Sequence, residues 1–216
     1  MIPAKKFSFG GLGNLDFPTF IQAFQLPLDT ADQNITLWES FRTGDKEAFA
    51  ELFRANYEAL FRFGSKFTTD KDLLEDCIQD LFVEIWQSRS KAPVISVRAY
   101  LLKSLKYKLL KAFRRKGSQL PLADNGEIVF EWSHETILIM EQEEAEKKKR
   151  VADALSRLSS RQKEIIYLKY YQNLSYDEVS EIMNINYQVA RNLLYQAIRS
   201  MRQLLSGSLE LFFFFL

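Results

Sequence analysis

Residues 174–199 constrain the fold more than any other part of the chain, because they have the pattern of two helices separated by a tight turn. Ser175 and Glu178 have the S-x-x-E spacing of a capping box, which satisfies the first free backbone N–H groups of a helix. Asn184 and Asn186 then interrupt the apolar periodicity, and asparagine is favoured both in turns and at helix starts. The sequence therefore predicts a short helix, a turn and a longer second helix.

The second of these helices is basic on its polar side. No acidic residue occurs between Glu181 and Glu210, whereas Arg191, Arg199 and Arg202 do. A short helix, a tight turn and a basic second helix are typical of the helix-turn-helix that reads DNA. A helical hairpin whose basic face is only solvated would show the same pattern, so the rest of the chain has to decide between them.

The charges of the chain are separated by sign. The formal net charge is only +1, yet the segment from Asp70 to Glu84 is acidic and the segment from Arg98 to Lys116 holds basic residues without an acidic one. Hydrophobic residues make up 47% and charged residues 26%, which is ordinary for a protein that buries a core. This asymmetry predicts two different partners, an anionic polymer and a basic or polar protein surface.

The sequence lacks the residue clusters and motifs that several classes of protein require. Cys77 is the only cysteine and His134 the only histidine, so neither a disulfide framework nor a metal-ligand cluster is expected. No phosphate-binding glycine loop or nucleophile elbow occurs, and we expect no enzymatic activity and no cofactor. We also expect no membrane span, because no apolar run reaches about 18 residues. Without a signal peptide pattern, a cytoplasmic location is expected.

Apolar residues at helical spacing predict an all-α fold of two small helical domains joined by an extended linker, the second domain ending in the helix-turn-helix. Turn residues without helical period indicate the linker. The predicted parts are a flexible extension at 1–35, a first domain at 36–116, the linker at 117–135, a second domain at 136–206 and a hydrophobic tail at 207–216.

Two helices of the predicted first domain have polar faces that suit partners. In the helix at 72–87, Phe82 and Trp86 lie among acidic residues. Aromatic residues surrounded by polar groups are typical of docking surfaces. A solvated acidic face beside two core aromatics would show the same pattern. The helix from Val97 interleaves basic residues with tyrosines, which suits unpaired nucleic acid because cations meet phosphates and rings stack on bases. A merely solvated basic face is the alternative.

The motifs also occur in a recognisable order. By this order the chain resembles, over about residues 38–205, a bacterial sigma factor of the extracytoplasmic-function (ECF) group, which has only regions 2 and 4. The residues that carry the resemblance are Glu75, Asp76, Gln79, Phe82, Trp86, Tyr100, Leu101, Arg114, Arg115, the L-S-x-R-Q-K-E motif at Leu158–Glu164 and L-S-Y-D-E-V at Leu174–Val179.

The resemblance implies two roles for the first domain. Residues 45–87 are similar to the part of region 2 that docks on the clamp helices of the RNA polymerase β′ subunit, and residues 88–116 to the part that melts and reads the −10 promoter element. Many members of the group carry Asn and Asp where this chain has Tyr107 and Lys111. The docking candidates are Glu75, Asp76, Gln79, Asp80, Phe82 and Trp86. The −10 candidates are Arg98, Tyr100, Lys103, Lys106, Tyr107, Arg114 and Arg115.

The resemblance also implies that the linker threads toward the polymerase cleft and that the helix-turn-helix reads the −35 element while the β-subunit flap binds the same domain. An anti-sigma factor is a further expected partner, and the tail is expected to dock on it or on the chain itself. Glutamine and asparagine suit adenine, and arginine suits guanine. The −35 candidates are Ser175, Tyr176, Tyr187, Gln188, Arg191, Asn192, Tyr195 and Arg199. A free-standing transcriptional regulator is the alternative function.

Overall fold

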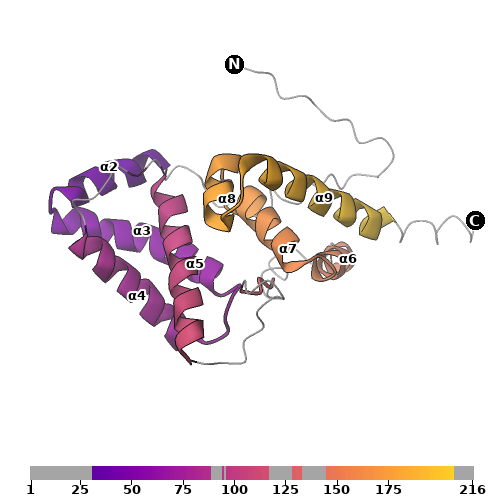
Figure 1. Cartoon of the computed structure of the whole chain (residues 1–216), viewed down its shortest axis with the longest axis horizontal. Coiled ribbons are helices and arrows are strands. Elements are labelled where there is room, and N and C mark those ends of the chain that lie inside the picture. The colour runs from indigo at the N-terminus through magenta and orange to yellow at the C-terminus, as the bar shows by residue number, and fades with distance from the viewer. Residues whose placement is uncertain (1–30, 89–93, 95, 117–127, 133–144, 207–216) are drawn as a thin grey trace, which may run out of the picture.

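The computed structural model describes residues 31–88, 94, 96–116, 128–132 and 145–206, and these residues are helical apart from short connections. Figure 1 shows α5 between the other N-terminal helices and the C-terminal ones. This confirms the predicted all-α class for the described residues. The elements are α2 (Ala31–Arg42), α3 (Lys46–Gly64), α4 (Lys71–Gln87), α5 (Val97–Lys116), α6 (Ala145–Ser156), α7 (Ser160–Ile166), the π-helical turn η3 (Tyr167–Tyr171), α8 (Tyr176–Met183) and α9 (Tyr187–Ser206).

Local capping explains where the first helices begin. The carboxylate of Asp45 accepts hydrogen bonds from the backbone N–H groups of Glu47 at 2.8 Å and Ala48 at 3.2 Å, and Asp70 accepts one from Leu73 at 2.9 Å. Each cap satisfies N–H groups that have no partner within the helix. The predicted start of the helix at 72–87 agrees closely with the structure, in which α4 begins at Lys71.

One predicted boundary differs from the structure. The N-terminal extension was expected to reach residue 35, but α2 already begins at Ala31, and residues 1–30 lie outside the described part. In the C-terminal half, α7 continues at Tyr167 into a π-helical turn, where the backbone N–H of Gln172 donates to the carbonyl of Tyr167 at 2.9 Å. The tail at 207–216 and most of the predicted linker also lie outside the described residues.

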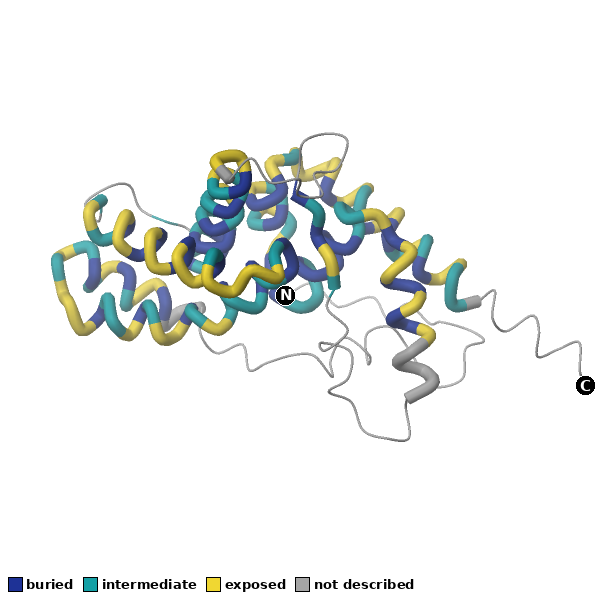
Figure 2. Tube along the Cα trace, turned by 90° about the horizontal axis from the view of Figure 1, so that it is seen from below, coloured by how far each residue is buried: buried dark blue, intermediate teal, exposed yellow. Residues whose placement is uncertain are grey.

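The buried side chains of α2–α5 and of α6–α9 form one continuous cluster. Figure 2 shows buried residues along the inward sides of the helices in both halves. Residues 128–132 of the predicted linker join the halves: the N–H of Glu131 donates to the carbonyl of Lys66 at 2.8 Å, and that of Phe130 to the hydroxyl of Ser160 at 2.6 Å. This part of the linker is therefore packed between the two halves.

None of the helices within the described ranges is both long and apolar enough to cross a membrane.

Candidate nucleic-acid interface

The helix-turn-helix is built by short-range hydrogen bonds. The N–H of Glu178 donates to the Ser175 hydroxyl at 3.2 Å, and the N–H of Ser175 donates to the Glu178 carboxylate at 2.6 Å, so the expected capping box is present. Asn184 ends α8 in the left-handed conformation with φ of 51°, which asparagine tolerates better than most residues. The N–H of Val189 then donates to the side chain of Asn186 at 2.8 Å and starts α9.

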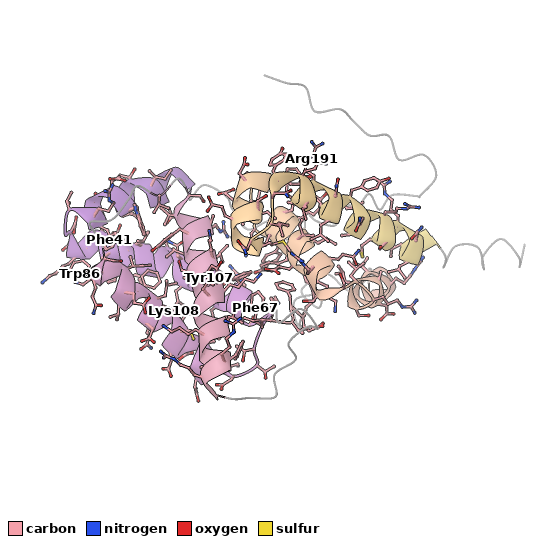
Figure 3. The ribbon with its side chains drawn as sticks, viewed as in Figure 1. Phe41, Phe67, Trp86, Tyr107, Lys108 and Arg191 are labelled. Atoms are coloured by element: carbon pink, nitrogen blue, oxygen red, sulfur yellow. The ribbon has the colours of Figure 1, made fainter. Side chains whose placement is uncertain are left out.

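One face of α9 is left free of the core. Ala190, Leu194, Ala197 and Met201 are buried against the other helices of the C-terminal half. The opposite face therefore projects away from the core, and Arg191 points away from the body of the molecule (Figure 3). All six α9 candidates are exposed and share this face: Tyr187, Gln188, Arg191, Asn192, Tyr195 and Arg199.

Rings and cations order this face at its N-terminal end. The Lys169 Nζ lies 4.8 Å from the ring centroid of Tyr176, which packs edge to face against Tyr187 with 5.6 Å between centroids. The Arg191 guanidinium lies 6.0 Å from the Tyr187 ring, within the range of a cation–π attraction. Lys169 was not predicted, because it belongs to the preceding turn. Burial lowers the pKa of Lys169, and Glu178 acts in the opposite direction.

A hydrogen bond between two amides orders the same face beside the Tyr187–Arg191 pair. The side-chain N–H of Gln188 donates to the side-chain oxygen of Asn192 at 3.0 Å. Both amides are exposed and keep donors and acceptors free for base edges. Tyr176, by contrast, is half-buried, and the Ser175 hydroxyl already accepts the capping hydrogen bond. The exposed polar groups suited to contact bases therefore lie on α9.

The −10 candidates on α5 divide into two groups. Tyr107, Arg114 and Arg115 are exposed, while Tyr100 is half-buried with its ring centroid 5.4 Å from that of Trp38. Arg98, Lys103 and Lys106 face the C-terminal helices instead. The structure thus keeps only part of the predicted basic face open to solvent.

Ion pairs connect the second group to α7 and α8. Lys106 Nζ lies 2.6 Å from a Glu164 carboxylate oxygen, and Lys103 Nζ lies 3.9 Å from one of Glu181. Burial lowers the pKa of Arg98, and Tyr167 and Glu178 act in the opposite direction. On another side of α5, Lys108 pairs with Glu84 of α4 at 2.6 Å, and Figure 3 labels Lys108.

The docking candidates on α4 also lie in two environments. Phe82 is only 3% exposed, and its ring centroid lies 4.9 Å from that of Phe53. Trp86 is half-buried, with its ring centroid 5.0 Å from that of Phe49. For Phe82 the structure agrees with the alternative interpretation, a core aromatic beside an acidic face. The exposed candidates are Glu75, Asp76, Gln79 and Asp80.

Val83 is the apolar residue that α4 does expose, at 53%. The sequence pattern did not indicate Val83, because it lies outside the apolar stripe of α4 and a single exposed valine has no distinctive signature. It lies on the same helix as the four exposed polar candidates and adds an apolar contact to that surface.

Comparisons with known proteins match both halves of the chain. Residues 52–119 match the family model described as sigma-70 region 2, and residues 148–201 match sigma-70, region 4. The chain is 25% identical over 195 residues to the ECF RNA polymerase sigma factor SigK of Mycobacterium sp. (strain JLS), covering 87% of this chain and 97% of that protein. The SigK protein of Mycobacterium ulcerans (strain Agy99) is 23% identical over 189 residues, covering 84% and 98%.

Solved structures share the fold. CnrH in complex with the cytosolic domain of CnrY superposes with a TM-score of 0.54 at 19% identity, covering 81% of this chain and 97% of that one. The sigma factor RpoE of Bartonella quintana, solved with the anti-sigma factor NepR, gives a TM-score of 0.52 at 20% identity, covering 73% and 96%.

Proposed function

Because the chain carries sigma-70 regions 2 and 4 and resembles ECF sigma factors along most of its length, we propose that it is a promoter-specificity subunit of RNA polymerase. It binds core polymerase and directs transcription initiation at promoters that it recognises by their −35 and −10 elements. In this proposal region 2, with α2 included, comprises residues 31–116, and region 4 comprises residues 136–206. The order of the two regions along one chain is the observation that carries this proposal.

In this proposal the exposed face of α9 reads the −35 element. The N-terminal residues of a recognition helix reach base edges in the major groove. Arg191 is the candidate for a guanine, and the amides of Gln188 and Asn192 are candidates for adenine. Tyr195 and Arg199 lie further along the same helix and contact the DNA backbone.

The helix α5 provides the −10 contacts. Tyr107, Arg114 and Arg115 are exposed and combine an aromatic ring with two cations, the combination that binds single strands by stacking and by phosphate contacts. The chain has Tyr107 and Lys111 where many ECF sigma factors have Asn and Asp, so the −10 sequence that those members read is not carried over to this chain.

The polymerase-docking surface is the exposed acidic face of α4. Glu75, Asp76, Gln79 and Asp80 supply its polar groups and Val83 its apolar contact, while Phe82 and Trp86 support the helix from the core side. Core polymerase is the partner, through its β′ clamp helices, and the β flap binds region 4.

The protein acts without catalysis of its own and in the cytoplasm, where promoter DNA and polymerase are found. An anti-sigma factor is a further partner. Two structural relatives, CnrH and RpoE, were solved with the cytosolic domain of CnrY and with NepR, and this supports an anti-sigma factor for the present chain.

In vitro transcription over a randomised promoter library tests the function. Core polymerase with the full chain should enrich promoters that share two elements, whereas core polymerase alone should enrich none. A free-standing regulator would instead bind duplex DNA without joining the polymerase. Transcripts that do not depend on the added chain would refute the proposal.

A further inference from the structure

We propose that Gln188 and Asn192 read one adenine of the −35 element as a single unit, and not one base each. In this unit Gln188 makes the base contact. Asn192 is a positioning residue, which fixes the Gln188 amide through the hydrogen bond between the two side chains. The inference rests on the proposed role of α9 in −35 recognition, and it adds which amide touches the base and how many bases the pair reads.

The two amides lie in the middle of the exposed face of α9. Successive residues of an α-helix are rotated by about 100°, since one turn takes 3.6 residues. This rotation places Gln188 and Asn192 opposite the buried stripe that contains Ala190 and Ala197, and one turn apart along the axis. Residues four apart on a helix are neighbours, so both side chains extend into the same space outside the core.

Gln188 keeps the groups that recognise adenine while it is bonded to Asn192. One N–H of its amide donates to the Asn192 side-chain oxygen at 3.0 Å. A glutamine amide has two N–H groups and one carbonyl oxygen, so the second N–H and the oxygen remain available. Adenine presents the acceptor N7 and the N6 amino donor in the major groove, and one glutamine can satisfy both. Gln188 is therefore a complete adenine reader within the pair.

Asn192 is less suited to read a base of its own. Bidentate recognition of adenine by asparagine needs its oxygen as the acceptor, and this oxygen already accepts from Gln188. A separate contact by Asn192 would have to share the oxygen, or break the bond and leave the Gln188 amide free to rotate. An amide that is held in place loses less conformational entropy when it binds. The intact pair is therefore the favoured reading unit.

Arg191 lies on the same face but outside this unit. Its guanidinium lies 6.0 Å from the ring centroid of Tyr187 and is ordered by that ring. Figure 3 shows Arg191 pointing away from the body of the molecule. We therefore expect Arg191 to read a different base pair, and its replacement marks a second position of the element.

The test measures base preference at each position of the −35 element. Core polymerase with the full chain transcribes a barcoded library randomised over that element, and sequencing of the transcripts gives the enrichment of each base. The control is Gln203→Ala, at an exposed glutamine near the far end of the same helix. The compared variants are Gln188→Ala, Asn192→Ala, the two combined, Asn192→Asp and Arg191→Ala.

Gln188→Ala should lower the adenine preference at one position by about tenfold. Asn192→Ala should lower it at the same position by about threefold, because the Gln188 amide must then be immobilised on binding. The double variant should match Gln188→Ala, since no amide is left to position. Asn192→Asp should keep the preference, because its carboxylate still accepts the Gln188 N–H, although the added negative charge weakens binding to all sequences.

Four results would overturn the unit. They are loss of preference at two different positions in the two single variants, losses that multiply in the double variant, an adenine preference that survives Gln188→Ala, and a loss in Asn192→Asp equal to that in Asn192→Ala. Failure of the proposed −35 role gives another pattern, in which the natural chain enriches no −35 element or Arg191→Ala and both amide variants leave every position unchanged. All substituted side chains are exposed, so the fold should persist, and circular dichroism checks this.

Discussion

Arg191, the proposed guanine contact, shows how neighbouring rings order a single residue on α9. Its guanidinium lies beside the Tyr187 ring, which is supported in turn by Tyr176 and Lys169. A side chain that is already ordered loses less conformational entropy when it binds. The ring contacts therefore favour the geometry in which Arg191 projects from the helix.

Replacing Arg191 by alanine should reduce initiation at a −35-dependent promoter by about tenfold or more, because a base contact of arginine contributes about 1–3 kcal/mol of discrimination. Binding to core polymerase should stay unchanged. Runoff transcription and co-purification measure the two effects. Arg157→Ala, which removes an exposed arginine after α6, is the control, and an equal loss in both assays for Arg191→Ala would contradict the assignment.

Phe82 contributes to the stability of the fold and not to binding, because its side chain is buried. Alanine at this buried position should lower the free energy of unfolding by about 3–5 kcal/mol, because it removes a packed ring and leaves a cavity. Urea denaturation followed by circular dichroism measures the change. Val83→Ala, at the exposed neighbour, is the control and should cost little. A stability loss as small as that of the control would show that Phe82 is not packed as described.

At the scale of elements, α4 has two faces with separate tasks. Its inward face carries the stripe of Leu74, Ile78, Leu81 and Ile85, all nearly completely buried. Its outward face carries Glu75, Asp76, Gln79 and Asp80. Substitutions on the outward face can therefore change binding without changing the packing of the helix.

Asp76→Ala with Asp80→Ala should weaken assembly with core polymerase by about tenfold, since each lost charged contact in such a surface contributes on the order of 1 kcal/mol. The melting temperature should change little. Native gel titration of core polymerase checks the affinity. Asp153→Ala, at an exposed carboxylate of α6, is the control. Unaltered assembly of the double variant would place the docking face elsewhere.

At the scale of the whole molecule, Phe130 joins the two regions into one core. Its ring contacts the rings of Phe67 and Tyr167, which belong to different regions. Its backbone N–H donates a hydrogen bond to the Ser160 hydroxyl. Because the buried cluster is continuous, the two regions should unfold together.

Calorimetry should therefore show a single unfolding transition for the natural chain. Phe130→Ala should lower stability by about 3–5 kcal/mol through the cavity it leaves, and should split the transition in two as the regions uncouple. Val129→Ala, at the half-buried neighbour, is the control. Two transitions in the natural chain would show that the joint contributes no coupling.

The helices of this protein and its helix-turn-helix were predictable from the sequence, because their determinants are short-range. The caps at Asp70 and Ser175 and the turn at Asn184 act within a few residues of where they occur. The face of α9 was predictable for the same reason, since apolar spacing shows which side is buried. The order of the motifs was sufficient to indicate the resemblance to ECF sigma factors.

The tertiary structure alone decided which of the predicted surfaces are open. Phe82 is buried because α3 packs over it, and half of the basic face of α5 is covered because region 4 docks there. The pairing of Lys106 with Glu164 joins residues 58 positions apart, and no local pattern specifies such a contact. Local preferences determine the elements, whereas the docking of buried faces determines which charges meet.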